Sequence, residues 1–238
     1  MAVEDVWPLF GLEIQSPRLL LRPARDDDFD ALAQAAIDGI HDWPQTPFAS
    51  PWNEAEPAQL RRNLATFHWR LRSQLSPARW HVPFVVEFEG QTVGSQDLSA
   101  HDFANRRTVE TGSWLTKRVQ GQGLGVEMRA ALLSFAFDHL DAEWAESSAM
   151  SWNAASLGVS RKLGYQLNGV TRVSPKEGEP GDNQNVRLPK GDFIRPDWSI
   201  EVRGADAALA QLGIISSRFP ESVQALVFGA TSPGKPLH

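Results

Sequence analysis

The chain has 238 residues, of which 42% are hydrophobic and 22% are charged, and this is a globular composition with enough apolar side chains for a core. Its formal net charge of −6 and its pI near 5.5 argue against broad nucleic-acid binding, because such binding needs a basic surface. The sequence contains no cysteine, which excludes disulfides, thiolate metal sites and a cysteine nucleophile.

The first part of the chain predicts one strand and two helices after a short lead-in over residues 1–16. The lead-in lacks the basic and apolar regions of a signal peptide, and no apolar run approaches the roughly 20 residues of a membrane span. We therefore expect a cytoplasmic protein. Residues 18–22 predict a strand, and the acidic start of residues 26–39 predicts a helix. Apolar residues at helical spacing predict a second helix over 56–75.

Residues 41–57 contain four prolines and predict a long loop, which in a compact domain is more often functional than idle. Nine tryptophans stand beside a single tyrosine in the whole chain. Most tryptophans are expected to be core or interface anchors. The alternative is that Trp43, Trp52, Trp69 and Trp80 help to wall a binding cleft, and the sequence leaves both interpretations open.

The rest of the chain predicts a sheet with helices between some of its strands. Glu89 and Gly90 give a hairpin signal between the first two strands. In chain order, the expected elements are strands at 84–88, 92–98 and 108–115, a helix at 124–140, a strand at 144–151, a helix at 153–163, and strands at 170–174 and 185–193 around a turn at 175–182. This order predicts an α/β (α+β) fold with a mixed, mostly antiparallel central sheet and helices on both faces.

Three alternating glycines, Gly121, Gly123 and Gly125, lie where a loop becomes a helix. Glycine lets backbone N–H groups approach a ligand, and a helix N-terminus favours an anion such as a pyrophosphate. The spacing fits neither the dinucleotide fingerprint nor the phosphate loop that ends in Gly-Lys-Ser/Thr. What remains is the pattern Gln120-x-x-Gly123-x-Gly125.

That pattern resembles the acyl-CoA-binding motif of the GNAT acyltransferase superfamily. Asn153 and Ser156, followed by residues 161–165, resemble the second signature half of the same superfamily. The opening at residues 17–23 is similar to the RimJ/RimL-like branch. The resemblance covers roughly residues 17–195, and it implies a GNAT fold.

The resemblance implies that acyl-CoA lies along one strand and one loop. The pyrophosphate would rest on the backbone N–H groups of Gln120, Gly121, Gln122, Gly123, Leu124, Gly125 and Val126. The pantetheine arm would pair with the preceding strand as an added strand does, at Trp114, Leu115 and Thr116. Asn153 would hold the pantetheine or the acyl end. No metal is implied.

For catalysis, the resemblance implies that Ser156 acts as the acid for the departing thiolate. The only tyrosine, Tyr165, occupies a position where an aromatic residue packs, so we do not expect it to be the acid. The family's base residue cannot be assigned by resemblance in this sequence. We expect Glu110 on the central strand to serve as base. Asp97 and His101, acting through water, are the alternatives.

The expected function is acyl-CoA-dependent transfer of an acyl group to a primary amine, with acetyl as the first expectation and succinyl as the second. The acceptor could be a protein N-terminus, a lysine or a small amine. A succinyl carboxylate could be received by one of several arginines, which are Arg61, Arg62, Arg70, Arg72 and Arg79. The alternative function is a catalytically silent GNAT-fold protein that binds CoA as a sensor or scaffold. No nucleic-acid or membrane partner is expected.

Residues 1–198 are expected to form the acyltransferase domain, and residues 199–238 a C-terminal extension. Within the extension we expect an edge strand at 200–203, a helix at 205–212 and a disordered tail. Its apolar residues have no obvious place in the basic fold, so the extension is a candidate element for homodimerisation.

Overall fold

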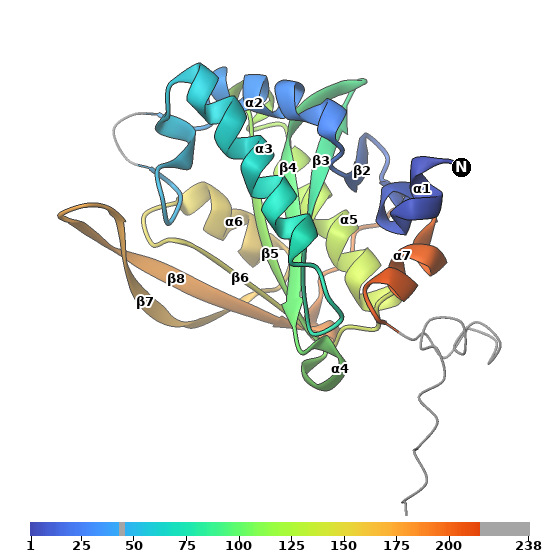
Figure 1. The fold of residues 1–238 in the computed structure, drawn as a ribbon. Coiled ribbons are helices and arrows are strands. Elements are labelled where there is room, and N and C mark those ends of the chain that lie inside the picture. Colours follow the sequence, from blue (N-terminus) through green and yellow to red (C-terminus); the bar gives the residue numbers. More distant parts are fainter. Residues whose placement is uncertain (43–45, 215–238) are drawn as a thin grey trace, which may run out of the picture.

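A nine-stranded sheet forms the frame of the protein, in the order β7-β8-β6-β5-β4-β3-β2-β1-β9 (Figure 1). The computed structural model describes residues 1–42 and 46–214. The strands are β1 Glu13–Gln15, β2 Leu19–Pro23, β3 Arg79–Phe88, β4 Gln91–His101, β5 Thr108–Leu115, β6 Trp144–Met150, β7 Gln166–Lys176, β8 Glu179–Pro189 and β9 Glu201–Arg203. All neighbouring strands in this sheet are antiparallel except β5 and β6. The predicted mixed, mostly antiparallel sheet is confirmed.

Helices cover both faces of the sheet (Figure 1). The helices are α1 Val3–Val6, α2 Phe29–Ile37, α3 Pro57–Ser73, α4 Phe103–Arg106, α5 Leu124–Asp138, α6 Ala154–Lys162 and α7 Ala205–Gln211. Helices α2 and α3 pack over a smaller apolar cluster that includes Leu32, Leu60 and Val85. Helices α5 and α7 pack over the main cluster on the opposite face, with α6 beside α5. The predicted helices at 26–39, 56–75, 124–140 and 153–163 are confirmed.

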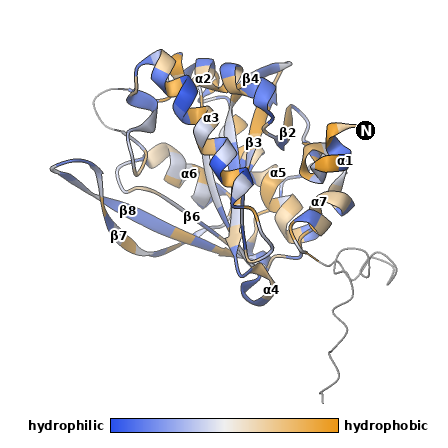
Figure 2. Ribbon diagram, in the orientation of Figure 1, coloured by the Kyte–Doolittle hydropathy of each residue, from blue (hydrophilic) through white to orange (hydrophobic). Residues whose placement is uncertain are grey.

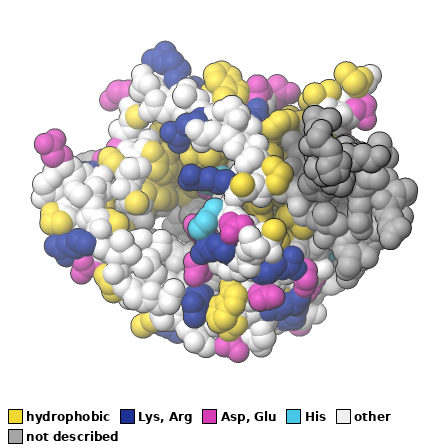
Figure 3. Space-filling model, turned by 60° about the horizontal axis from the view of Figure 1, so that its bottom comes forward, with side chains coloured by type: hydrophobic (Ala, Val, Ile, Leu, Met, Phe, Trp, Pro, Cys, Tyr) yellow, Lys and Arg dark blue, Asp and Glu magenta, His cyan; other side chains and the backbone are white. Residues whose placement is uncertain are grey.

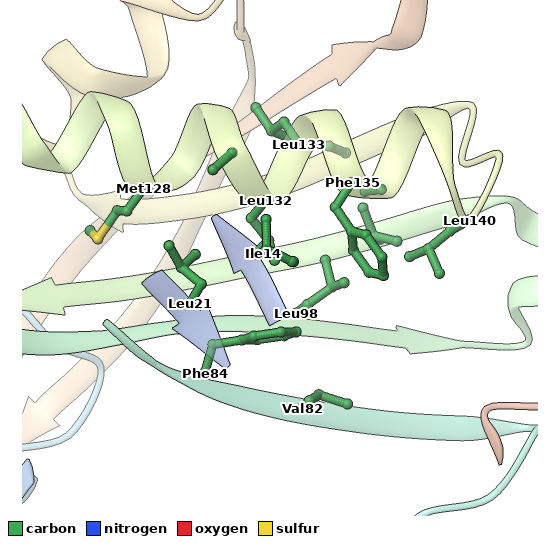
Figure 4. Close-up of a cluster of buried hydrophobic side chains, with 14 of the residues drawn as sticks. Ile14, Leu21, Val82, Phe84, Leu98, Met128, Leu132, Leu133, Phe135 and Leu140 are labelled. Atoms are coloured by element: carbon green, nitrogen blue, oxygen red, sulfur yellow. The ribbon is translucent and has the colours of Figure 1, made fainter. Parts of the chain in front are cut away.

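Helix α5 lies at the centre of the main core and is apolar along most of its length (Figure 2). Its side chains Met128, Leu132 and Phe135 point toward the sheet, where they face Leu21 and Leu98 (Figure 4). Nearly every residue of α5 is buried, although the sequence predicts an amphipathic helix. A helix buried on all sides needs apolar residues all round, so its charged residues Glu127 and Arg129 require a separate explanation.

The hairpin of β3 and β4 turns at Glu89 and Gly90, whose φ angles of 52° and 73° are both positive. Two positive φ angles give the turn whose twist matches that of the strands, as the sequence predicts. The chain reverses within the predicted turn at 175–182, but the turn is shorter than predicted, because β7 and β8 continue through most of this range and reverse at Gly178. Pro180 is tolerated within β8 because β6 pairs with β8 only from Asn183 onward.

The start of the C-terminal extension belongs to the same core as the rest of the chain. Strand β9 pairs with β1, a strand that lies within the predicted lead-in. The backbone N–H of Leu9 donates to Gln211 Oε1 at 2.8 Å, and Leu209 and Ile214 are buried in the main cluster. The core therefore crosses the predicted boundary at residue 198. The predicted disordered tail lies outside the described residues, and the role in dimerisation stays a prediction.

The position of β5 depends on close contact with Gly94 of β4. A Cβ atom on residue 94 would collide with the carbonyl oxygen of Trp114 and would lie 2.9 Å from the Cα atom of Leu115. We expect Gly94→Ala to lower the free energy of unfolding by about 3 kcal/mol, because the two backbones must separate. Urea unfolding would measure this change. Gly191→Ala is the matched control, since a Cβ atom there meets no neighbour within 4 Å, and an equal effect of both variants would contradict the account.

Candidate functional site

The largest hollow that brings together the predicted site residues opens where β5 and β6 diverge. These parallel strands pair only as far as Thr111 and Ser147. Beyond that point β5 keeps β4 on one edge and leaves its other edge unpaired. The resulting cleft has a volume of about 620 Å³. Its lining includes the predicted residues Trp114, Leu115, Gln120, Gly121, Gly123, Gly125, Val126, Asn153 and Ser156.

The glycine loop presents a run of free backbone donors at the N-terminus of α5. No acceptor among the described residues takes a hydrogen bond from the N–H groups of residues 121–125. Gly121 and Gly123 have φ angles of 76° and 82°, which glycine adopts without strain. The N–H groups of Gln120 and Val126, which are also expected to face the ligand, donate to the carbonyls of Lys117 and Gly123.

The side chain of Gln120 has a structural task within this loop. Its Nε2 donates to the carbonyl oxygens of Ile40 and Leu115, each at 2.7 Å. This single amide therefore ties the end of β5 to the segment after α2. Thr116, Gln122 and Leu124 were also predicted to contact the ligand, but they lie outside the cleft lining.

A buried carboxylate fixes the glycine loop to the start of the chain. Glu127, in the first turn of α5, accepts from Ser16 Oγ at 2.8 Å and from the backbone N–H of Arg18 at 2.9 Å. The Arg18 guanidinium also forms an ion pair with Glu127 at 2.6 Å and donates to the carbonyl of Gln122 at 3.2 Å. The opening segment at 17–23 thus supports the loop directly.

Aromatic side chains form one wall beside the cleft. Phe48 packs against Trp52, and Trp52 packs against Trp114, with ring centroids 5.2 Å and 5.6 Å apart. Trp80 is buried in the core, and Trp69 is exposed and donates to Asp26. Of the four tryptophans proposed as cleft walls, Trp52 alone among the described ones supports the wall, and Trp43 lies outside the described residues.

Helix α6 contributes the far side of the cleft. The side chain of Asn153 caps this helix by accepting from the backbone N–H of Ser156 at 3.0 Å. Ser156 Oγ makes no hydrogen bond to another described residue, so its hydroxyl is available to a ligand in the cleft. Asn153 and Ser156 are therefore brought together as the sequence predicts.

The predicted base Glu110 lies in a neighbouring hollow of about 340 Å³, which shares Ser148 with the cleft. Glu110 is half-exposed, and His101 Nδ1 lies 3.6 Å from its carboxylate. Glu146 lines the same hollow and is the register partner of Glu110 across the β5–β6 pair.

Acidic and basic side chains are intermixed on the face shown in Figure 3, which fits the modest net charge of −6.

Asp97 lies closer to the cleft along the sheet. It is the register partner of Gly112, and a Cβ atom on residue 112 would lie 4.0 Å from Asp97 Oδ2. His81 Nε2 contacts the same Oδ2 at 3.0 Å, and Ser95 Oγ donates to Oδ1 at 3.2 Å. Because Gly112 lines the cleft and carries no side chain, it leaves a short path from the cleft to this carboxylate.

Sequence reasoning missed the arginine that lines the cleft. The arginines suggested as carboxylate receivers lie elsewhere, and Arg61 and Arg72 form ion pairs with Asp30 and Asp26. Arg129 lines the cleft instead, although only 3% of its surface is exposed. The available signal was a charged residue inside an otherwise apolar helix.

Arg129 sits in a low-dielectric environment beside Tyr165. Burial lowers the pKa of the Arg129 guanidinium and raises the pKa of the Tyr165 phenol, which is also fully enclosed. Tyr165 OH lies 3.4 Å from Thr111 Oγ1, and its ring belongs to the main core. Tyr165 is therefore a packing residue, in agreement with the prediction.

Residues 18–166 match the family model described as an acetyltransferase (GNAT) domain. The fold is similar to that of RimJ from Mycobacterium smegmatis in complex with CoA-disulfide, with a TM-score of 0.63 and 20% identity over 86% of this chain and 93% of that one. A RimL ribosomal-protein acetyltransferase in complex with coenzyme A gives a TM-score of 0.57 and 19% identity, covering 73% and 95%. A GNAT-family acetyltransferase from Bacillus anthracis gives a TM-score of 0.58 and 18% identity, over 75% of this chain and 99% of that one. With a family match over more than half of its length, this chain belongs to the GNAT acetyltransferase family.

Proposed function

We propose that this protein is an acyl-CoA-dependent N-acyltransferase that moves an acyl group from CoA to a primary amine. The observation that carries the proposal is the run of free N–H groups at residues 121–125, next to the unpaired edge of β5. Together they offer an anion site and a strand edge in one cleft. The CoA-bound neighbours of the same fold support this choice of ligand.

The donor would bind through its pyrophosphate and its amide arm. A pyrophosphate suits the five N–H groups and the positive end of the α5 dipole. The two amides of the pantetheine arm can pair with the free edge of β5 between Gly112 and Leu115, as an added strand would. Asn153 and Ser156 then face the end of the arm that carries the thioester.

The chemistry would be direct transfer from thioester to amine. The acceptor ammonium first loses a proton to a base, and the neutral nitrogen attacks the carbonyl carbon to form the C–N bond. The C–S bond then breaks and its electron pair goes to sulfur, which takes up a proton from Ser156, and Ser156 regains a proton from the nitrogen as the amide forms. Glu110 is the proposed base, and Asp97 beside Gly112 is the alternative through a bridging water.

The acceptor would approach from the α2–α3 face, where carboxylates gather. Glu110, Glu146 and Asp97 all lie on or near the fork of β5 and β6, so their field favours a cationic amine. The RimL neighbour is a ribosomal L7/L12 α-N-protein acetyltransferase, so a protein α-amine is the first acceptor to test here. Lysine side chains and small amines are the other arms of the same screen, and acetyl-CoA and succinyl-CoA are the first donors.

Gly121 offers a sharp test of donor binding. A Cβ atom on residue 121 would meet no protein atom within 4 Å, so a methyl group there would occupy the proposed anion site. We expect Gly121→Ala to weaken CoA binding about tenfold or more in calorimetry, a loss of about 1.4 kcal/mol.

The matched control for this test is Gly178→Ala. Gly178 has a φ of 75° against 76° for Gly121, and it also has open space around its Cα. Both variants should lose about 1 kcal/mol of folding stability from the left-handed backbone. Equal CoA affinity in the two variants would show that residue 121 does not contact the donor.

Ser156→Ala and Glu110→Gln test the transfer step. We expect each variant to reduce kcat about 100-fold, because a positioned acid or base contributes a factor of this order. CoA affinity should change little, because neither side chain would hold the pyrophosphate. Free thiol released from acetyl-CoA in the presence of an amine panel measures the rate.

Ser73→Ala, an exposed serine at the end of α3, is the control and should keep full activity. If the wild-type protein binds CoA yet releases no thiol with any amine, the silent CoA-binding alternative replaces the transferase. If the wild-type protein shows no binding heat with CoA, both the transferase and the silent CoA-binding function are contradicted.

A further inference from the structure

Arg129 is a buried cation without a carboxylate partner. Its Nη1 donates to Ser160 Oγ and its Nη2 donates to Ser113 Oγ, each at 2.9 Å. Its Nε is buried and makes no hydrogen bond to any described residue. No Asp or Glu in residues 1–42 or 46–214 forms an ion pair with it.

This arrangement is costly unless an anion arrives. A guanidinium stays charged in proteins, and burying a charge without a counter-charge is strongly unfavourable. The phenol of Tyr165 is the other titratable group near Arg129, and its pKa is raised, so it supplies no negative charge at neutral pH. The two serine hydroxyls offset part of the desolvation of Arg129, but they carry no charge.

Ser113 connects this cation to the cleft. Its hydroxyl oxygen accepts from Arg129, and no described residue accepts its proton, so the O–H remains free to donate. Ser113 lies on the diverging half of β5 and lines the cleft. Ser160, by contrast, donates its own proton to the carbonyl of Ser156 at 3.3 Å. Ser113 is therefore the partner of Arg129 that can donate a hydrogen bond to a ligand while its hydroxyl is polarised by the guanidinium.

The position of Ser113 along β5 indicates which part of the donor it meets. The glycine loop lies beyond the C-terminal end of β5, and the strands fuse again at Thr111 and Ser147. An arm that starts at the loop and follows the free edge passes Leu115 first and reaches Ser113 shortly before the fork. The end of the pantetheine arm carries the sulfur atom.

We propose that Ser113 and Arg129 form a positively polarised donor that stabilises negative charge on the CoA sulfur as the thioester breaks. This inference rests on the proposed acyltransferase function. Ser113 would contact the sulfur, and Arg129 would act through Ser113 as a positioning and polarising residue. In the step, the C–S electron pair moves to sulfur while the new C–N bond is retained, and the thiolate is then protonated to give free CoA.

Ser113 and Ser156 make different contacts, which suit them to different roles. No described cation donates a hydrogen bond to the Ser156 hydroxyl, which is free to give up a proton. Ser113 is held by Arg129 and would donate a hydrogen bond without losing its proton. A hydrogen bond polarised by a charged donor is stronger than a neutral one.

The test measures the acidity of the CoA thiol when it is bound, and it needs no acceptor. CoA and desulfo-CoA, which lacks the sulfur, are titrated by calorimetry from pH 6 to pH 10, and the ratio of their affinities is followed. The reference value is the pKa of the CoA thiol free in solution. If the site stabilises the thiolate, the pKa of the bound thiol is lower, and relative CoA affinity rises with pH between the two values.

In wild-type protein we expect this rise to reach at least about tenfold, which corresponds to a bound pKa about one unit or more below that of the free CoA thiol. Ser113→Ala and Arg129→Met should both reduce it to twofold or less. Ser134→Ala, a buried serine on α5 outside the cleft lining, should keep the full rise. In turnover assays, Ser113→Ala should lower kcat with little change in KM.

The inference is overturned if the affinity ratio has the same pH dependence in wild type and Ser113→Ala. If Arg129→Met does not fold, Ser113→Ala decides alone, because it leaves the buried guanidinium in place. Failure of the proposed function has a different signature, since wild-type protein would then either bind neither CoA nor desulfo-CoA, or bind CoA and release no thiol with any amine.

Discussion

The arrangement of this protein depends on its one parallel pair of strands in the described sheet, β5 and β6. Parallel neighbours need a crossover connection, and α5 supplies it. The crossover forces α5 to begin at the end of β5, so the N–H groups of residues 121–125 open beside the unpaired edge of that strand. The divergence of β5 and β6 after Thr111 then gives the cleft its depth. An anion site and a strand edge are thus placed together by topology, before any side chain contributes.

Two charged residues on the buried helix α5 serve opposite ends of this arrangement. Glu127 is satisfied by Ser16 and Arg18, and it secures the glycine loop from behind. Arg129 receives only serine hydroxyls and lines the cleft. Glu127 therefore holds the loop in place, whereas the charge of Arg129 is not neutralised at the point where an anion would form. The residue that stabilises the loop and the residue proposed to assist the reaction are thus only two positions apart on the same helix.

Local signals in the sequence predict the parts of the site that are local in structure. The bounds of β5 and the start of α5 follow from short motifs, and the structure confirms them. The contacts of Arg129 with Ser113 and Ser160 join three elements, so no spacing rule could reveal them. The extent of the turn at 175–182 could not be predicted, because only the sheet order shows that β6 does not reach Pro180. The acceptors of the N–H groups of Gln120 and Val126 depend on the exact loop path, which no short motif determines.

The central claim is that the glycine loop and the free edge of β5 together hold acyl-CoA. A crystal structure of the protein with acetyl-CoA tests it most directly. The account predicts pyrophosphate oxygens within about 3 Å of the N–H groups of residues 121–125, and the pantetheine amides paired with β5 between Gly112 and Leu115. Density for the ligand elsewhere, or a pyrophosphate that does not contact this loop, would contradict it.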